Sequence, residues 1–280
     1  MLTFPVSYPL VMGILNVTPD SFFDGSRCVV PDEALRRVAA LVSEGADIID
    51  VGGESTRPGA ASVSLAEELD RVVPVIEAIR REFDIPISVD TTKPAVMRAA
   101  VAAGAAMVND IKALGEPQAM ETAAQLNVPV CLMHMQGEPR TMQAAPCYVD
   151  VVAEVYRFLE QRVAECLAAG IARHNLVVDP GFGFGKDISH NLALLRELPR
   201  FNALGLPVLV GLSRKSMFGA ILGKPVEQRL YASVAAASLA VWFGAQVVRV
   251  HDVAATRDAI AVCDAVKSGH PREQRVDLPK

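Results

Sequence analysis

Short apolar runs alternate along the chain with longer stretches of helical periodicity. Each of eight runs is about as long as a strand that is buried on both faces, and they lie at 11–15, 47–51, 86–89, 106–108, 129–133, 176–178, 207–210 and 246–250. Apolar residues recur at helical spacing over 32–44, 65–83, 93–103, 117–126, 149–169, 189–196 and 226–243. Glycine or proline stands at many junctions, as is typical of helix C-caps and turns.

This alternation favours a closed barrel of parallel strands. Eight strand–helix units in 280 residues match the size of a (β/α)8 barrel. The alternative is an open doubly wound sheet, which would place a glycine-rich phosphate loop after the first strand. Residues 16–20 (Asn-Val-Thr-Pro-Asp) are not such a loop. The sequence therefore predicts an α/β fold: one TIM-barrel domain over 1–280, with its core at about 11–266.

Polar residues stand where each predicted strand ends, and in a (β/α)8 barrel these C-terminal ends form the active-site mouth. They are Asn16, the segment 52–58, Asp90, Asn109, Asp110, His134, Asp179, the segment 213–216, Arg249 and His251. Local explanations remain open for some of them. Asp90 also fits a helix N-cap, and Asn109 and Asp110 also fit turn-forming residues. Lys215 also fits a solvent-exposed lysine, and His134 also fits a histidine packed behind the site.

The residue types at these positions indicate two kinds of ligand contact. A carboxylate such as Asp179 can accept two N–H bonds from the edge of a flat heterocycle, with Asn109, Asp110 and Lys215 beside it. A second group of residues indicates a pocket for a polyanion, because the closing strands of such barrels often contribute phosphate sites. Its members are Asn16, Arg57, Arg249 and His251.

The sequence lacks the motifs of two common kinds of active site, and this narrows the types of reaction that it indicates. No GxSxG motif and no clear Cys–His pairing is present, so covalent catalysis is not indicated. The glycine-rich segment 181–187 lacks the spacing of a P-loop. We interpret it as a flexible loop whose backbone approaches a planar ligand, with Phe184 either stacking on the ligand or capping the core.

Composition excludes several classes of protein. The chain is 51% hydrophobic and 21% charged, which excludes disorder. A net charge of −5 without a basic stripe disfavours a nucleic-acid partner. The five cysteines are scattered without a CxxC pair, which disfavours a disulfide framework and structural zinc and favours a reducing cytoplasm.

The N-terminus and one uncharged segment bear on the location of the chain. The N-terminal segment has no charged region ahead of its apolar stretch, so we expect no signal peptide. The uncharged segment from Leu230 to Val248 is long enough to span a membrane. Since it is rich in Ala and Ser and contains Gly244 and Gln246, we predict a buried helix followed by a buried strand instead.

Several long segments resemble the signatures of dihydropteroate synthases. The first two are Val11–Phe22 and Asp47–Gly59, and further matches lie at 88–91, 108–111, 133–137, 179–186, 213–216 and 249–252. The resemblance extends from about Val11 to Val266 in the order of the family. One departure lies in the first loop, where Ser26 and Arg27 follow Gly25 in place of a second glycine.

The resemblance implies a reaction, a cofactor and partners. Members of the family join 4-aminobenzoate to (7,8-dihydropterin-6-yl)methyl diphosphate, giving 7,8-dihydropteroate and diphosphate in folate biosynthesis. The reaction is the transfer of an alkyl or aryl group. The resemblance further implies Mg2+ as cofactor, sulfonamides as inhibitors and a homodimer, which we expect in the cytoplasm without a nucleic-acid or membrane partner. In the implied mechanism diphosphate departs first, and the neutral arylamine then attacks, which needs no strong base.

The resemblance also implies site residues. Those expected to bind the pterin are Asp90, Asn109, Asp110, Met133, Asp179, Gly183, Phe184, Gly211 and Lys215. Those expected to bind diphosphate are Asn16, Thr56, Arg57, Arg249 and His251, with Mg2+ on Asn16. Those expected to bind aminobenzoate are Arg57, Pro58, Phe184, Lys215 and Ser216. The expected catalytic residues are Asp90, which would stabilise the developing pterin cation, Arg57 and Lys215.

Two other functions remain open. A methyltetrahydrofolate-type pterin methyltransferase would share pterin-reading residues such as Asn109 and Asp179. It would have no use for Arg57 or for the anion site at Arg249 and His251. A non-catalytic pterin-binding homologue should have lost parts of the loops, and none of the loop motifs is missing.

Overall fold

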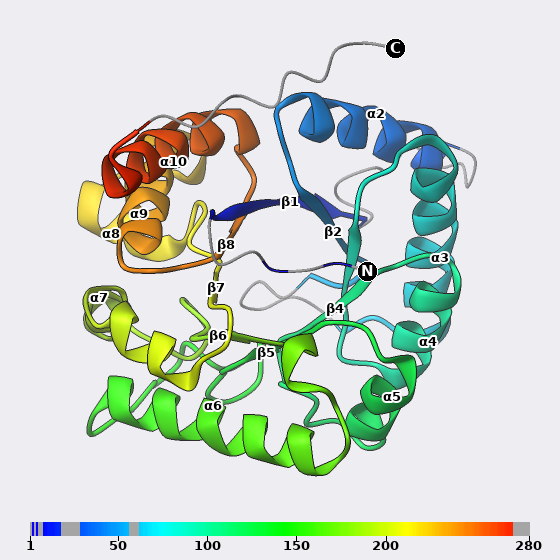
Figure 1. Ribbon diagram of the computed structural model, residues 1–280, viewed down its shortest axis with the longest axis horizontal. Coiled ribbons are helices and arrows are strands. Elements are labelled where there is room, and N and C mark those ends of the chain that lie inside the picture. Colours follow the sequence, from blue (N-terminus) through cyan, green and yellow to red (C-terminus); the bar gives the residue numbers. More distant parts are fainter. Residues whose placement is uncertain (1, 3, 5–7, 18–28, 56–61, 271–280) are drawn as a thin grey trace.

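The computed structural model describes residues 2, 4, 8–17, 29–55 and 62–270, which build one barrel of eight parallel strands. Hydrogen bonds connect the strands in the order β6-β5-β4-β3-β2-β1-β8-β7. A parallel bridge between Val178 and Val208 joins β6 to the residues entering β7. The two ends of the sheet therefore meet, and the predicted (β/α)8 barrel is confirmed (Figure 1).

Five observed strands, β1 to β4 and β6, end one or two residues beyond the predicted apolar runs, whereas β5, β7 and β8 end where the runs end. The strands are β1 (Leu10–Asn16), β2 (Ile48–Gly52), β3 (Ile87–Asp90), β4 (Met107–Asp110), β5 (Val130–Met133), β6 (Leu176–Asp179), β7 (Leu209–Val210) and β8 (Val247–Val250). Asn16, Asp90, Asp110 and Asp179 are thus the last residues of their strands. Their backbones still take part in the sheet, which fixes them more firmly than a loop would.

Helices surround the barrel on its outer side (Figure 1). They are α2 (Val29–Ser43), α3 (Leu65–Glu82), α4 (Pro94–Ala102), α5 (Ala119–Leu126), α6 (Val151–Ala168), α7 (Ile188–Arg196), α8 (Ser216–Leu222), α9 (Leu230–Trp242) and α10 (Val253–Ser268). Helical periodicity did not single out α8 or α10. The predicted stretch 226–243 divides into a short 3-10 turn, Val226–Gln228, and α9.

The segment from Leu230 to Val248 is a helix followed by a strand, as predicted. It forms α9 and the start of β8, and Val247 and Val248 are buried in the barrel wall. Among the residues that the structure describes, no helix is long and apolar enough to cross a membrane.

An apolar floor fills the lower interior of the barrel. We use this name for the buried cluster contributed by inward-facing strand residues: Leu10, Met12, Ile48, Met107, Cys131, Val177, Leu209 and Val247. Leu2, Phe4 and Tyr8 pack against it from the N-terminus. Because side chains alternate along a strand, the residue two positions beyond each floor residue also faces the interior. The floor therefore supports whatever stands at those positions.

Candidate functional site

A polar layer lies inside the barrel directly beyond the apolar floor. The inward positions two residues further along β2, β4, β6 and β8 carry Asp50, Asn109, Asp179 and Arg249. The first three are exposed by 5% or less. Asp90 joins them from the end of β3 and pairs in register with Asn109 of β4. The polar residues predicted at separate strand ends therefore meet in one site.

Arg249 is the centre of this layer. Its Nε donates to Oδ2 of Asp50 over 2.6 Å, and its Nη2 donates to Oδ2 of Asp90 over 2.8 Å. Burial alone would lower the pKa of Arg249, but the two carboxylates raise it above its usual value. Burial raises the pKa of Asp90, and Arg249 opposes that shift. The N-cap alternative for Asp90 is wrong, because α4 begins after Lys93 without a side-chain cap.

Asp179 and Lys215 form the other side of the layer. Oδ1 of Asp179 accepts a hydrogen bond of 2.7 Å from the backbone N–H of Gly181. Burial raises the pKa of Asp179 to about 6, although this hydrogen bond opposes the shift. Burial lowers the pKa of Lys215 to about 8, although the nearby Asp179 opposes it. Nζ of Lys215 lies 4.3 Å from the centre of the Phe184 ring, a cation–π distance.

An apolar wall stands beside the polar layer. A separate buried cluster contains Ile111, Met133, Met142 and Phe184, and Met135 packs against it. Met133 and Phe184 were predicted site residues, whereas Ile111 and Met142 were not. Flat apolar walls with a few polar groups are typical of small-molecule sites.

Two predicted glycines leave room for site residues. A Cβ at Gly183 would lie 3.1 Å from Cδ of Lys215, and Gly183 has a φ of +77°. A Cβ at Gly211, at the end of β7, would lie 4.0 Å from Cβ of Arg249. A larger residue at Gly183 would push Lys215 away and would also strain the backbone.

The glycine-rich segment 181–186 is anchored from within by Lys186. The Nζ of Lys186 donates to the carbonyls of Gly181 (2.9 Å) and Phe184 (3.0 Å) and lies 2.9 Å from Nδ1 of His134. Lys186 is only 2% exposed, and burial lowers its pKa to about 7. The interpretation of this segment as a flexible loop therefore needs correction, because four buried contacts of a single ammonium group hold it.

His134 is a packed residue behind the site, which was one of the two alternatives. Its ring meets the edge of Phe158 with centroids 4.9 Å apart. Burial, together with the charge of Lys186, lowers its pKa to about 3. It is therefore neutral and orients the loop without entering the mouth.

Asp110 points away from the polar layer. Its two carboxylate oxygens accept backbone hydrogen bonds from Lys112 (2.7 Å) and Leu114 (3.0 Å). These bonds hold a turn in which Ala113 and Leu114 have φ values of +50° and +59°. The structure thus favours the turn-forming alternative for Asp110 over the pterin contact.

The structure places the residues predicted to bind an anion at two separate positions. Asn16 and His251 line a pocket beside the end of β1, together with Arg36, Arg37 and Arg214. Nδ1 of His251 lies 3.0 Å from Oγ of Ser213, and Nη2 of Arg37 donates to the His251 carbonyl. Arg249 instead lies in the polar layer. The sequence analysis assigned none of the three other arginines to an anion site. It placed Arg214 at the mouth within the segment 213–216, and it missed Arg36 and Arg37, which stand in a segment of helical spacing.

Some predicted residues remain untested. Thr56, Arg57 and Pro58 lie outside the described residues. Ser216 is the exposed first residue of α8, directly after Lys215.

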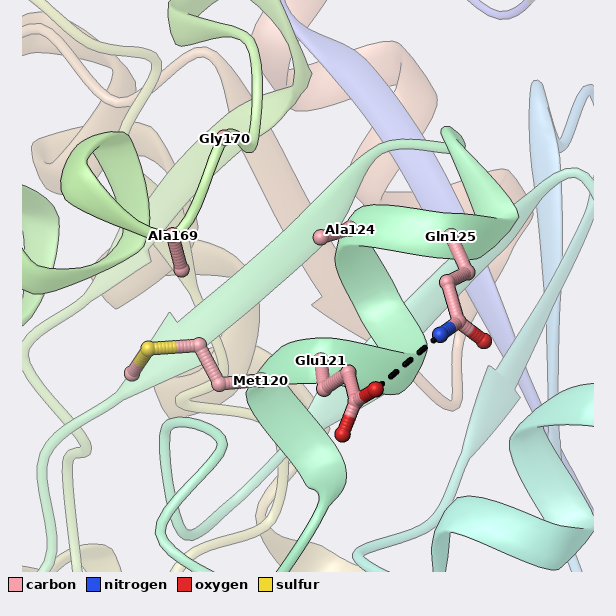
Figure 2. Close-up of a pocket in the computed structure, with 6 residues that line it drawn as sticks. All are labelled: Met120, Glu121, Ala124, Gln125, Ala169 and Gly170. Atoms are coloured by element: carbon pink, nitrogen blue, oxygen red, sulfur yellow. Dashed lines mark hydrogen bonds between the residues drawn. The ribbon is translucent and has the colours of Figure 1, made fainter.

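A second pocket lies away from the mouth, between α5 and the end of α6 (Figure 2). Its lining is Met120, Glu121, Ala124, Gln125, Ala169 and Gly170. Gln125 donates to Glu121 on the same helix (Figure 2). No strand-end residue contributes to it, so it does not compete with the polar layer as a candidate site.

Comparisons with known proteins agree with this geometry. The family described as "Pterin binding enzyme" matches residues 12–251. A dihydropteroate synthase of Haemophilus influenzae is 57% identical over 260 residues, covering 93% of this chain and 94% of that protein. The structure of the Yersinia pestis dihydropteroate synthase in a sulfonamide drug complex is 52% identical with a TM-score of 0.91, covering 95% of this chain and 97% of that one. The Xanthomonas albilineans enzyme in complex with 7,8-dihydropteroate is 50% identical with a TM-score of 0.85, covering 94% and 95%.

Proposed function

Because the chain belongs to the pterin-binding enzyme family, among the dihydropteroate synthases, we propose that its barrel mouth makes 7,8-dihydropteroate. The substrates are (7,8-dihydropterin-6-yl)methyl diphosphate and 4-aminobenzoate, and the second product is diphosphate. The observation that carries this proposal is the polar layer, in which Asp90, Asn109 and Asp179 meet Lys215 beside an apolar wall. Buried donors and acceptors of both kinds beside apolar side chains suit a flat, hydrogen-bonding heterocycle.

We assign the pterin to this layer and to the wall. One carboxylate oxygen of Asp179 accepts a hydrogen bond from the Gly181 N–H. The lone pairs that this bond leaves free accept hydrogen bonds from the N–H edge of the pterin. Lys215 donates to the pterin. Met133 and Phe184 cover its faces, with Gly183 and Gly211 leaving the space that it needs.

The chemistry needs charge stabilisation more than a nucleophile. The bond between the pterin methylene and the diphosphate oxygen breaks, and the electron pair leaves with diphosphate. The positive charge left on the pterin is stabilised by the ionised Asp90, held in place by Arg249. The amine lone pair of 4-aminobenzoate then attacks the methylene, and the amine loses its proton.

The residues around the end of β1 fit a Mg2+ ion that would assist the departure of diphosphate. The Oδ1 of Asn16 is a hard oxygen ligand at the end of β1. Gly52 lies beside it on the neighbouring strand β2, where a Cβ would come within 3.9 Å of that oxygen and 3.7 Å of Oδ2 of Asp90. Among the described residues no group of three acidic, His or Cys side chains could hold a metal by itself. This suits Mg2+, which usually shares few protein oxygens with substrate phosphates; when bound, it would neutralise the departing diphosphate.

We place 4-aminobenzoate beside the pterin, against Phe184, Lys215 and the start of α8 at Ser216. Thr56, Arg57 and Pro58 remain predictions for the same region. Sulfonamides, which mimic this substrate, are proposed inhibitors.

The decisive experiment is an assay for diphosphate release with both substrates. Release that depends on 4-aminobenzoate, with dihydropteroate appearing in equal amount, supports the proposal. A methyltransferase or a non-catalytic pterin-binding protein would release none.

Pterin binding should pass through a maximum between pH 6 and pH 8. Asp179 accepts hydrogen bonds when ionised, and its pKa is raised to about 6, so affinity falls as the pH drops through that value. Lys215 donates as an ammonium group, and its pKa is lowered to about 8, so affinity falls again as the pH rises through that value. Calorimetric titration with a pterin that lacks diphosphate measures the profile. In Lys215→Met the alkaline limb should be absent; if it persists, another group causes it.

His251→Ala should selectively lower the affinity for the substrate that carries diphosphate. His251 lines the arginine-rich pocket with Asn16, and a hydrogen bond to a charged group contributes about 1.5–3 kcal/mol, or about 10- to 150-fold in affinity. The matching pterin without diphosphate should bind as in the unchanged protein. Equal losses for both ligands, measured by calorimetry, would remove His251 from the anion site.

We propose a homodimer formed through α9 and its neighbours. Helix α9 contains no charged residue, yet Tyr231 (82%), Leu239 (48%) and Trp242 (49%) are exposed. Next to it, α10 exposes Val262 and Val266, and Lys267 of α10 bonds to the α9 carbonyl of Val241. An apolar surface of this kind on a water-soluble helix usually marks an interface. Sedimentation velocity should show a dimer, and Leu239→Glu should give monomers; a monomeric unchanged protein at micromolar concentration would exclude it.

We also propose a cytoplasmic location. Four cysteines, Cys131, Cys147, Cys166 and Cys263, are free thiols in the described part of the chain, as is usual in a reducing compartment. Cys28 lies outside the described residues.

A further inference from the structure

Asp50 takes part in the polar layer, yet no sequence motif pointed to it. It lies in the middle of β2, is fully buried, and faces the interior of the barrel. Its Oδ2 accepts from Nε of Arg249 (2.6 Å) and from Nδ2 of Asn109 (3.3 Å). A single carboxylate oxygen thus holds one residue assigned to the pterin and one that supports Asp90.

The contact with Asn109 determines what that amide offers to a ligand. An ionised carboxylate only accepts hydrogen bonds, so it must face the NH2 group of Asn109 and not its oxygen. If the amide turned over, two oxygens would meet at the same short distance without a proton between them. The side-chain hydrogen bond of Asn109 to the described residues uses its Nδ2, which leaves Oδ1 as an acceptor for an N–H of the ligand.

Through its contact with Arg249, Asp50 also fixes the position of Asp90. Arg249 is held at Nε by Asp50 and reaches Asp90 through Nη2. The fixed planar fork of guanidinium transmits orientation between its two carboxylate partners. Moving Asp50 would therefore move both Asn109 and Asp90, which are neighbours in the β3–β4 register.

Within the described part of the chain, the hydrogen bonding of Asp50 leaves one of its oxygens unpaired. Its Oδ1 is buried and has no hydrogen-bond partner among the described residues. The same is true of Oγ of Ser88, which pairs with Asp50 in the β2–β3 register. Buried polar groups are normally satisfied, so this adjacent pair of exceptions calls for an explanation, such as a functional role or a bound water or ion.

We propose that Asp50 is a positioning residue for the pterin site: it fixes the donor–acceptor orientation of the Asn109 amide and the position of the Arg249–Asp90 pair. This inference rests on the proposed function, because the ligand that it prepares for is the pterin.

The test compares Asp50→Asn with Asp47→Asn in titrations with 6-hydroxymethyl-7,8-dihydropterin, after thermal melting has shown that each variant is folded. Asp47 is a matched control on the same chain segment. Like Asp50, it accepts two hydrogen bonds on its Oδ2, one of them from an arginine: the donors are the backbone N–H of Val11 and Nη2 of Arg257. It precedes β2 at the opposite end of the barrel. We expect Asp50→Asn to lose about tenfold or more in pterin affinity, as for other charged hydrogen bonds, and Asp47→Asn to lose none.

A second variant keeps the proposal testable if Asp50→Asn fails to fold. The variant Asp50→Glu keeps a carboxylate as the partner of Arg249, so no buried cation is left unpaired, but its longer side chain displaces the oxygen that Arg249 and Asn109 share. It should fold and lose several-fold in pterin affinity.

The outcomes separate the two levels of inference. If the unchanged protein does not bind the pterin, the proposed function fails, and the role of Asp50 fails with it. If the unchanged protein binds but folded Asp50→Asn binds equally well, only the role of Asp50 is overturned. A folded Asp50→Glu variant that binds the pterin as tightly as the unchanged protein overturns it too.

Discussion

Asp179→Asn is expected to abolish useful pterin binding while the barrel stays folded. The amide keeps the shape of the carboxylate and can still accept the hydrogen bond from Gly181 N–H, so the turn after β6 is retained. It cannot accept two hydrogen bonds from the pterin edge, and it loses the charge that faces Lys215. Losing hydrogen bonds to a charged group costs about 1.5–3 kcal/mol, which is about 10- to 150-fold in affinity.

Asp110→Asn is the matched control for this prediction. Asp110 is also a buried carboxylate at the end of a strand, but both of its oxygens are bonded to backbone N–H groups of a turn. We expect this variant to lose stability and to keep its pterin affinity. Calorimetry that shows unchanged affinity in folded Asp179→Asn, or a large loss in Asp110→Asn, would reverse the assignments of the two residues.

Arg249→Met is expected to give the largest loss of stability of any single substitution in the site. It would leave Asp50 fully buried and without its cationic partner. Removing one member of a buried ion pair typically costs about 3–5 kcal/mol, which is a large part of the total stability of about 5–15 kcal/mol of a native domain. Both the diphosphate substrate and the pterin without diphosphate should lose affinity, because Asp90 also loses its partner.

Arg257→Met provides the comparison for this substitution. Arg257 pairs with Asp47 outside the mouth, where the two side chains are 30% and 19% exposed, so water compensates for much of the lost contact. We expect a cost nearer 1 kcal/mol, as for other solvent-accessible pairs. Urea unfolding with equal m-values measures both costs. Similar midpoints for the two variants would contradict the central role of Arg249 in the polar layer.

The fold could be predicted from the sequence because its signals are local. Buried strands leave short apolar runs, and the helices that cover them leave a periodicity that a window of about 11–18 residues detects. Helices α8 and α10 were missed for different reasons. The first spans only 7 residues, and the second lies beyond the last strand, where no following run marks its end.

Most of the site could also be predicted, because parallel strands end at the same edge. Asn109, Asp179 and Lys215 stand at such ends and do meet. Asp110 stands at one as well but points outward, since neighbouring residues of a strand face opposite sides. Counting by twos from Met107 separates Asn109 from Asp110, and counting by twos from Ile48 in the run 47–51 places Asp50 on the inner face.

By itself, then, the sequence determined the number of strand–helix units, their order and the polar residues at the strand ends, since each of these depends on neighbours along the chain. Only the tertiary structure decided which of those residues are partners. Arg249 lies 199 residues from Asp50 and 159 from Asp90, and closure of the barrel brings them within hydrogen-bonding distance. Arg249 was expected on the diphosphate, and it lies between two buried carboxylates because β8 pairs with β1 beside β2. No local pattern records that pairing, since it arises from the register of strands far apart in the chain.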